Sequence, residues 1–252
     1  MRPVKVYAAE FRFYEELNDF RPPAQRKTTT TYHFSGAPGI KDPIEALGVP
    51  HTEVELIIVN GRSVGFDYRL QPGDRVAVYP VFESFDVTPL VRLREAPLRN
   101  VAFVLDVNLG KLTRWLRMLG FDAWYRNDFT DAQIADISVA ARRVILTRDR
   151  RLLYPKRITH GYWLRATDAD AQVREVLARF DLHGQIKPFR RCLDCNGTIE
   201  SVAKAAILDA LQPLTRKYYD AFYQCNDCRK VYWRGSHVAH MQRKLGDLLA
   251  QN

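Results

Sequence analysis

Three aspartates in the middle of the chain follow short apolar runs. Asp106 comes after AFVL, Asp128 after AWYRN and Asp149 after RVILTR, and the segments between the runs have helical spacing. This alternation predicts β-α-β-α-β, and therefore a parallel sheet with helices on its faces. Ligands of such sheets bind beyond the carboxyl ends of the strands. We therefore expect the three carboxylates at one edge of the sheet, with Asp131 at the start of the second helix beside them.

Carboxylates gathered at one sheet edge suit a hard divalent cation. Mg²⁺ takes oxygen ligands, and a metal can activate water and neutralise the charge that develops during phosphodiester hydrolysis. Without a metal the carboxylates would repel one another, so stability alone does not explain the cluster. The pattern favours a Mg²⁺- or Mn²⁺-dependent phosphodiesterase. The structural alternatives are that Asp131 caps a helix and that Asp149 caps a loop.

The four cysteines form two Cys-x-x-Cys pairs, Cys192/Cys195 and Cys225/Cys228. Two such pairs offer four thiolates to tetrahedral Zn²⁺, and a closed shell of four cysteines leaves no open position for catalysis, so the site is expected to be structural. The N-terminus shows no export signal, which predicts a cytoplasmic protein and metal binding in preference to disulfides or redox chemistry.

Basic and aromatic residues surround the cysteine pairs and have two interpretations. They could hold phosphates and stack bases, or they could form the packed face of a small zinc ribbon. No role is assigned to His237 or His240. The residues in question are Arg190, Arg191, Arg229, Lys230, Tyr232, Trp233 and Arg234.

The net charge of +9 is unevenly distributed. Lys and Arg outnumber Asp and Glu by 15 to 10 in residues 98–182 and by 11 to 6 in residues 183–252, whereas residues 1–97 hold 12 against 13. This asymmetry favours a nucleic acid as partner, although general solubility would also account for it. No apolar run approaches the roughly 18 residues of a membrane span, so no membrane association is expected.

Basic side chains accompany the acidic edge. Lys111, Arg114 and Arg117 recur every three residues on the helix expected at Leu109–Leu119, and Arg148 and Arg150 flank the third aspartate. We expect these five side chains to bind nucleic-acid phosphates. The alternative for the helix is a solvated basic face.

The rest of the chain predicts two flanking domains and a linker. Residues 1–85 have the strand and helix order of a β-grasp, and VELIIVNGRSVGFDYRLQPGDRVAVYP resembles the ubiquitin-like sulfur carriers. Because the chain continues past VYP without a Gly-Gly end, we expect a recognition or packing module that could bind a protein partner. Residues 86–99 predict a linker, 100–182 the α/β core and 183–252 the zinc ribbon. Within the ribbon, SVAKAAILDALQP has helical composition, with Pro213 as its stop.

Longer motifs connect these parts to known families. DAQIADISVAARRVILTRD resembles PIN-domain nucleases. FVLDVNLGKLTRWLRMLGFDAWY, RVILTRDRRLL and CRKVYWRGSH, in this order, resemble the Mut-seven C-terminal RNase family across nearly the whole chain. That resemblance implies an α/β fold: a PIN-like core with a C-terminal zinc ribbon, preceded by a ubiquitin-like domain.

The resemblance also implies a metal-dependent ribonuclease, with Asp106, Asp131 and Asp149 as its acidic residues. Following the PIN pattern, water would attack the phosphorus in line and leave 3′-hydroxyl and 5′-phosphate ends. Larger PIN domains carry a further acidic residue on a middle helix that has no match here, and Asp128 is the candidate for its place. Two alternatives stay open: an RNA- or ribosome-binding adaptor without turnover, and a toxin-like or sulfur-carrier partner role through the first domain.

Overall fold

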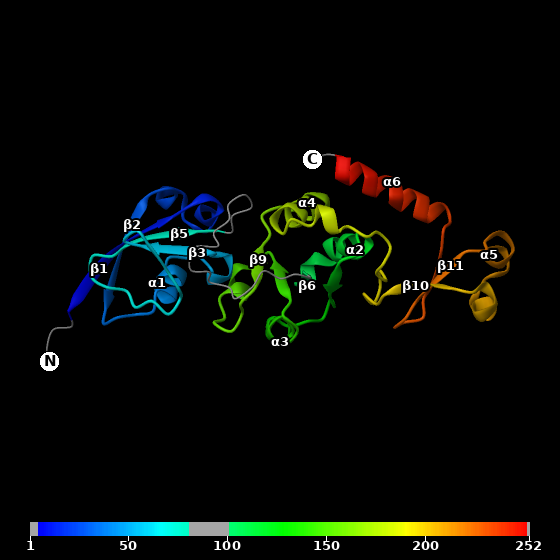
Figure 1. Cartoon of the computed structure of the whole chain (residues 1–252), viewed down its shortest axis with the longest axis horizontal. Helices are drawn as coiled ribbons and strands as arrows, with labels where there is room; N and C mark the ends of the chain where they lie inside the picture. The colour runs from blue at the N-terminus through cyan, green and yellow to red at the C-terminus, as the bar shows by residue number, and fades with distance from the viewer. Residues whose placement is uncertain (1–4, 81–100, 251–252) are drawn as a thin grey trace. The chain divides into compact units, whose positions relative to one another are not determined.

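A computed structural model describes residues 5–80 and 101–250 (Figure 1). The predicted linker, 86–99, lies outside these residues, and so do the side chains of His237 and His240. The chain divides into two compact units. The first unit is drawn from Met1–Asn100 and Ala135–Trp163, and the second from Val101–Ile134 and Leu164–Asn252.

The N-terminal domain is a five-stranded mixed sheet with the order β2-β1-β5-β3-β4. β1 and β5 are parallel, and the other neighbouring strands are antiparallel. This arrangement confirms the predicted β-grasp. The strands are β1 (Val6–Phe13), β2 (Thr29–Ser35), β3 (Leu56–Val59), β4 (Arg62–Val64) and β5 (Arg75–Tyr79).

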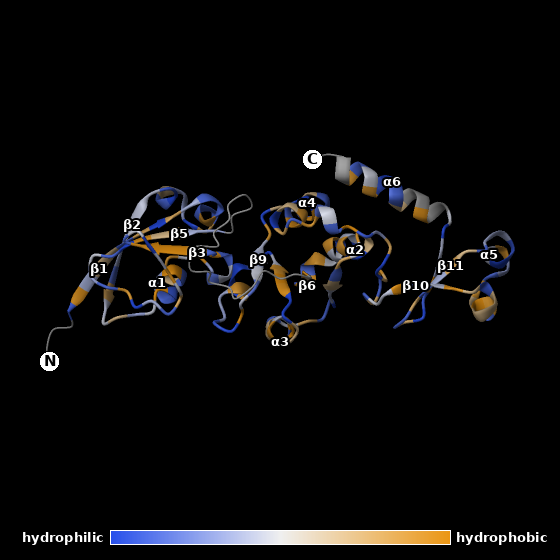
Figure 2. Ribbon diagram, in the orientation of Figure 1, coloured by the Kyte–Doolittle hydropathy of each residue, from blue (hydrophilic) through white to orange (hydrophobic). Residues whose placement is uncertain are grey.

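Local sequence accounts for this domain well. The turn between β3 and β4 is Asn60-Gly61, and both residues have positive φ, 50° and 84°, as a two-residue hairpin turn of this hand requires. The short helix α1 (Lys41–Ala46) buries Ile44 in the same core as Phe11 and Ile57. Figure 2 shows apolar residues along β3 and on one part of α1. Three 3-10 turns complete the domain: η1 (Glu15–Phe20), η2 (Pro23–Gln25) and η3 (His51–Glu53).

The central part is an α/β layer. Its sheet is all-parallel, as predicted, and its strand order is β7-β6-β8-β9. Every residue of β8 is buried, as expected for a strand covered on both faces. The strands are β6 (Ala102–Leu105), β7 (Asp122–Trp124), β8 (Val144–Thr147) and β9 (Gly161–Trp163). The helices are α2 (Gly110–Met118), α3 (Asp131–Ala141) and α4 (Ala169–Arg179), with the turns η4 (Val107–Leu109), η5 (Arg150–Leu153) and η6 (His183–Gln185).

The C-terminal ribbon is a three-stranded antiparallel sheet formed by β10 (Ile199–Val202), β11 (Phe222–Cys225) and β12 (Val231–Trp233). The prediction of a helix in SVAKAAILDALQP is wrong. That segment holds the end of β10 and a 3-10 turn, η7 (Lys204–Ala210), and Pro213 begins helix α5 (Pro213–Tyr218). Proline fits this first position because its fixed φ is helical and its missing N–H is not needed there.

A last helix, α6 (Ser236–Ala250), follows the ribbon. None of the helices in the described part of the chain has the length and apolar character needed to cross a membrane.

Candidate functional site

Asp106 directly follows β6, at the carboxyl end of a strand that is itself buried. Its side chain is only 7% exposed. The backbone carbonyl of Asp106 accepts from the amide of Leu109 at 2.9 Å and so begins η4, but the carboxylate does not cap this turn. A carboxylate this deeply buried needs hydrogen bonds or a cation to compensate for the water that it has lost.

Asp149 lies just beyond the carboxyl end of β8 and is the N-cap of η5. Its Oδ1 accepts from the backbone N–H of Arg151 at 2.9 Å, and both carboxylate oxygens contact the Arg151 guanidinium, at 3.3 and 3.2 Å. The Arg151 side chain, followed by its backbone N–H, holds the pKa of the Asp149 carboxyl below its usual range. The predicted loop-capping role is therefore present. It does not exclude a ligand role, because the Arg151 side chain is 89% exposed and can move away.

Asp131 is the first residue of α3, and Thr130 caps this helix. The Thr130 amide donates to Gln133 Oε1 at 2.8 Å, and the Gln133 amide donates to Thr130 Oγ1 at 3.3 Å. This reciprocal capping box leaves the Asp131 carboxylate exposed. Among the described residues it has no hydrogen-bond or ion-pair partner.

The prediction that Asp128 lies at the end of a strand is wrong. β7 ends at Trp124, and Asp128 sits in a turn four residues further on. Its carboxylate takes two hydrogen bonds from the Arg126 guanidinium, at 2.9 and 2.7 Å, which lower its pKa. The pair is exposed to solvent.

Two of the predicted phosphate-binding side chains on α2 face a groove of about 700 Å³. Lys111 and Arg114 are exposed, and Trp115 lines the groove beside them. Its other walls come from α4 and α6, which add Arg174 and Lys244 together with three aspartates. Arg148 is also exposed.

Arg117 does not belong to this basic surface, and the expectation that it contacts phosphate is wrong. The side chain is 3% exposed. Its Nε donates to the carbonyl of Ala123 at 2.9 Å, and its Nη1 donates to the carbonyls of Leu193 and Asp194 at 3.0 and 2.8 Å. Burial lowers the pKa of the guanidinium. Arg117 therefore joins α2 to β7 and to the cysteine region.

Arg150 is also engaged within the protein. Its guanidinium lies 3.9 Å from the ring centroid of Trp163 and 5.1 Å from that of Phe20, and it donates to the carbonyl of Asp19 at 3.0 Å. The expectation that Arg150 holds RNA is therefore not supported by this placement.

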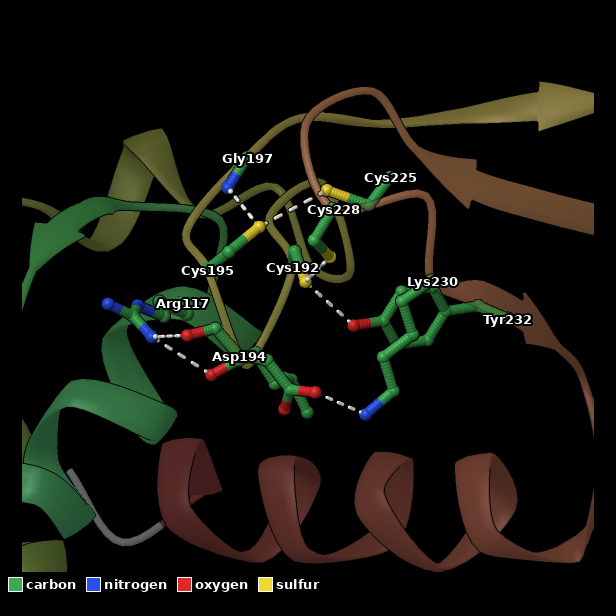
Figure 3. A network of polar contacts seen from close by, with 10 residues as sticks. Arg117, Cys192, Asp194, Cys195, Gly197, Cys225, Cys228, Lys230 and Tyr232 are labelled. Atoms are coloured by element: carbon green, nitrogen blue, oxygen red, sulfur yellow. Dashed lines mark hydrogen bonds and ion pairs between the residues drawn. The ribbon is translucent and has the colours of Figure 1, made fainter.

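The four cysteines come together in the ribbon, and they are free thiols (Figure 3). Their sulfur atoms all lie within 4.8 Å of one another. Ligands at the usual Zn–S distance of about 2.3 Å would have sulfurs about 3.8 Å apart in a tetrahedron, so the donor set and its spacing fit zinc. Two of these contacts join the two motifs: Cys192 to Cys228 at 3.6 Å and Cys195 to Cys225 at 3.3 Å.

Both cysteine motifs form the same turn. In the first knuckle, Cys192–Gly197, the amide of Asn196 donates to the carbonyl of Cys192; in the second, Cys225–Lys230, the amide of Arg229 donates to the carbonyl of Cys225. Asn196 and Arg229 both have positive φ, 71° and 61°. Each of the two turns therefore directs its two cysteine sulfurs toward the same point.

Polar groups around Cys192 favour the thiolate form that zinc requires, whereas the surroundings of Cys195 do not. The Tyr232 hydroxyl lies 3.0 Å from Cys192 Sγ (Figure 3). Burial opposes ionisation of Cys192, but backbone N–H groups of the knuckle and the tyrosine hydroxyl outweigh it and lower the pKa of this thiol to about 7. Burial and the neighbouring thiols raise the pKa of Cys195 to about 12.

The first knuckle is fastened to the outer edge of β7 by a residue that the sequence interpretation missed. Asn196 Oδ1 accepts from the Ala123 amide at 2.9 Å, and its Nδ2 donates to Asp122 Oδ1 at 2.7 Å. Arg191 adds an ion pair to the same aspartate. The available signal was the Asn-Gly that follows the second cysteine, since a turn residue is expected there.

Comparison with known proteins places these parts in families. The model of the Mut7-C RNAse domain matches residues 101–245, and that of the Mut7-C ubiquitin domain matches residues 6–86. Neither the curated proteins nor the solved structures gave a match. The first match covers the sheet, the aspartates and the ribbon together, and supports a role in RNA cleavage or binding. The chain therefore belongs to the Mut7-C RNAse family, with a Mut7-C ubiquitin domain preceding its nuclease domain.

Proposed function

We propose that the chain is a metal-dependent endoribonuclease that holds Mg²⁺ or Mn²⁺ on Asp106, Asp131 and Asp149, while zinc on the four cysteines is structural. The observation that carries the proposal is the buried carboxylate of Asp106 at the carboxyl end of a parallel strand, in a chain of an RNase family. The three carboxylates supply oxygen donors only, which suits a hard cation and not zinc.

Each residue has its own part in this proposal. Asp106 and Asp149 follow strands of one parallel sheet, and Asp131 opens a helix whose cap is already satisfied by Thr130 and Gln133. A bound cation would activate water and neutralise charge on the phosphate. Lys111 and Arg114 would hold neighbouring phosphates of the RNA at the groove beside α2.

Arg151 provides the counter-charge of Asp149 before a cation binds. The Asp149 carboxylate accepts two hydrogen bonds from the guanidinium and one from the backbone. A cation can reach the carboxylate once the Arg151 guanidinium leaves, because the backbone N–H of Arg151 is bonded to Oδ1 alone and Oδ2 is then free. The metal ion would replace the exposed Arg151 guanidinium while the backbone hydrogen bond stays in place. The turn would therefore stay folded with and without the metal.

Cleavage of a single-stranded RNA labelled at its 5′ end tests the proposal. The wild type should cleave when Mn²⁺ is added, and Asp106→Asn should abolish cleavage, because it removes one ligand charge from a buried position. Asp128→Asn is the matched control and should cleave normally, since Asp128 is exposed and paired with Arg126. A wild type that never cleaves with Mn²⁺, or an active Asp106→Asn variant, would reject the proposal.

An RNA-binding adaptor without turnover is the second candidate. The adaptor is favoured by the ion pairs that Asp128 and Asp149 form with arginines. An adaptor would bind RNA with or without Mn²⁺ and would show no metal-dependent cleavage. The same assay therefore separates the two candidates.

A further inference from the structure

Three consecutive polar residues of the ubiquitin-like domain are buried in η3. His51 is 5% exposed, Thr52 1% and Glu53 0%. Polar groups at this depth are mostly hydrogen-bonded, because partners compensate for the lost water. His51 contacts Glu45 and Phe66 within its own domain, and further partners of this turn lie outside it.

Those partners belong to the nuclease domain, in the segment leading into β9. Glu53 Oε1 accepts from the amide of Trp163 at 2.6 Å. The His51 ring bridges Glu45 Oε1, at 2.5 Å, and the carbonyl of Ile158, at 2.6 Å. Gly161 lies against both Thr52 and Leu153, because a Cβ at this glycine would lie 3.6 Å from Thr52 Cβ and 2.5 Å from Leu153 Cδ2.

A second set of contacts holds the turn that follows Asp149. At the start of η5, the Arg150 guanidinium lies over the Trp163 and Phe20 rings and donates to the carbonyl of Asp19 at 3.0 Å. At the end of η5, the Tyr154 hydroxyl donates to the carbonyl of Gly48 at 2.8 Å. The ubiquitin-like domain thus contacts both ends of the turn whose N-cap is Asp149.

Charge and ring contacts support the same contact surface. Lys156 pairs with Asp42 at 2.9 Å, and Lys41 donates to the carbonyl of Lys156 at 3.1 Å. Phe20 packs on Trp163 with ring centroids 5.0 Å apart. The contact combines buried hydrogen bonds, an aromatic pair and a salt bridge, as specific interfaces do.

We infer that the ubiquitin-like domain acts within its own chain, as a clamp that positions the Asp149 turn of the nuclease domain. Glu53 and Arg150 are its positioning residues, and neither needs to touch a substrate. Arg150 belongs to the turn itself, and Glu53 holds Trp163, whose Nε1 donates to the carbonyl of Arg148 at 3.2 Å. The value of this clamp for metal binding rests on the proposed function, whereas the contact itself does not. The surface of His51–Glu53 is consequently occupied and does not serve a separate protein partner.

Hydrogen exchange of the full-length protein tests the clamp without any assay of activity. The amides of Arg151, Leu152 and Tyr154 donate within the turn and report on its opening. Glu53→Ala removes the acceptor for Trp163 and should speed their exchange by roughly tenfold or more, since local opening would become easier. Glu53→Gln keeps an oxygen acceptor and should restore slow exchange.

A matched control separates positioning from general damage to the domain. Asp74 is 3% exposed and accepts from Tyr68, Asn60 and the Gln71 amide, all within the ubiquitin-like domain. Asp74→Ala should therefore destabilise this domain without changing exchange in the Asp149 turn. If Glu53→Ala does not fold, Arg150→Met opens the same contact from the nuclease side and should give the same faster exchange.

Mn²⁺ affinity measured by calorimetry completes the test. Glu53→Ala should weaken Mn²⁺ binding by roughly tenfold, as the loss of outer-shell support does at other metal sites, and Glu53→Gln should bind normally. Unchanged exchange of the turn amides in both Glu53→Ala and Arg150→Met would overturn the inference. A wild type that binds no Mn²⁺ would overturn the proposed function, and faster exchange in the variants would then still support the clamp.

Discussion

Arg117 donates from Nη1 to the backbone carbonyl of Asp194 at 2.8 Å and thereby ties α2 of the nuclease core to the turn between Cys192 and Cys195. The same guanidinium donates to Leu193 and, through Nε, to Ala123 of β7. Figure 3 shows the side chain beside the Asp194 backbone, below the four sulfurs. One buried cation on α2 therefore contacts both a strand of the core and the first cysteine knuckle.

Arg117→Met should destabilise the protein by about 3 kcal/mol, because the carbonyls of Ala123, Leu193 and Asp194 lose a charged donor. Urea unfolding at neutral pH measures this change. Arg114→Met, one turn earlier on the exposed face, is the control and should shift stability by less than about 0.5 kcal/mol. Equal stability of the two variants would contradict the role given to Arg117.

The purified protein should contain one zinc per chain, held by Cys192, Cys195, Cys225 and Cys228. Cys195→Ser should lower the zinc content and melt the ribbon, because metal binding and folding are coupled in such modules. Elemental analysis and near-ultraviolet circular dichroism measure the two effects. A zinc-free protein with an ordered ribbon would contradict this expectation.

Reversing the charge of both Lys111 and Arg114 to Glu should weaken RNA binding across unrelated sequences. Two lost phosphate contacts should reduce the slope of log affinity against log salt by about 1.4 for a single strand, since fewer counterions are released. Reversing Arg62 and Arg69, which are exposed on the ubiquitin-like domain, makes the same change in net charge and is the control. An identical slope in all three proteins would show that Lys111 and Arg114 are ordinary surface charges.

Asp149→Asn should abolish Mn²⁺-dependent cleavage and leave the metal-free protein nearly as stable as the wild type. Asparagine keeps an oxygen that can cap η5, and only the exposed Arg151 pair is lost. Thermal melting with and without Mn²⁺ tests this: the wild type should gain melting temperature and the variant should gain little.

The pH dependence of the same carboxylate follows from its lowered pKa. A carboxyl whose pKa is lower in the folded state contributes stability above its unfolded value, near 4, and loses it as the pH falls through the folded value. Arg151→Ala should move this acid loss to higher pH, because the guanidinium is the main cause of the shift. Unfolding measured from pH 2 to pH 6 should show the displacement.

Local signals predicted much of this fold. Asn60-Gly61 is a sequence that β-hairpin turns favour, and the helix expected at Leu109–Leu119 ends at Met118, shortly before Gly120 with its φ of 97°. The cysteine spacing predicted the cluster of four sulfurs. In each case the information lies within a few neighbouring residues, where turn and capping chemistry act.

The errors at Arg117 and Arg150 concern contacts between distant parts of the chain. Residues three apart on a helix drift by 60° per step, so Arg117 lies about 120° around α2 from Lys111 and faces the ribbon instead of the groove. Its acceptors are 76 and 77 residues away. Glu53 likewise finds its partner 110 residues later, at Trp163. Sequence spacing cannot identify such hydrogen-bond partners, because the packing of distant parts of the chain brings them together.

The contact between Asn196 and Ala123 has a consequence for solubility. β7 is the outermost strand of its sheet, and the Ala123 N–H and C=O are taken by Asn196 and Arg117. An uncovered strand edge can pair with the edge of another molecule, and proteins therefore block such edges. Here the block is the first cysteine knuckle, so unfolding of this knuckle would uncover β7. If the cysteines hold zinc as proposed, loss of the metal would leave this edge open to pairing with another chain.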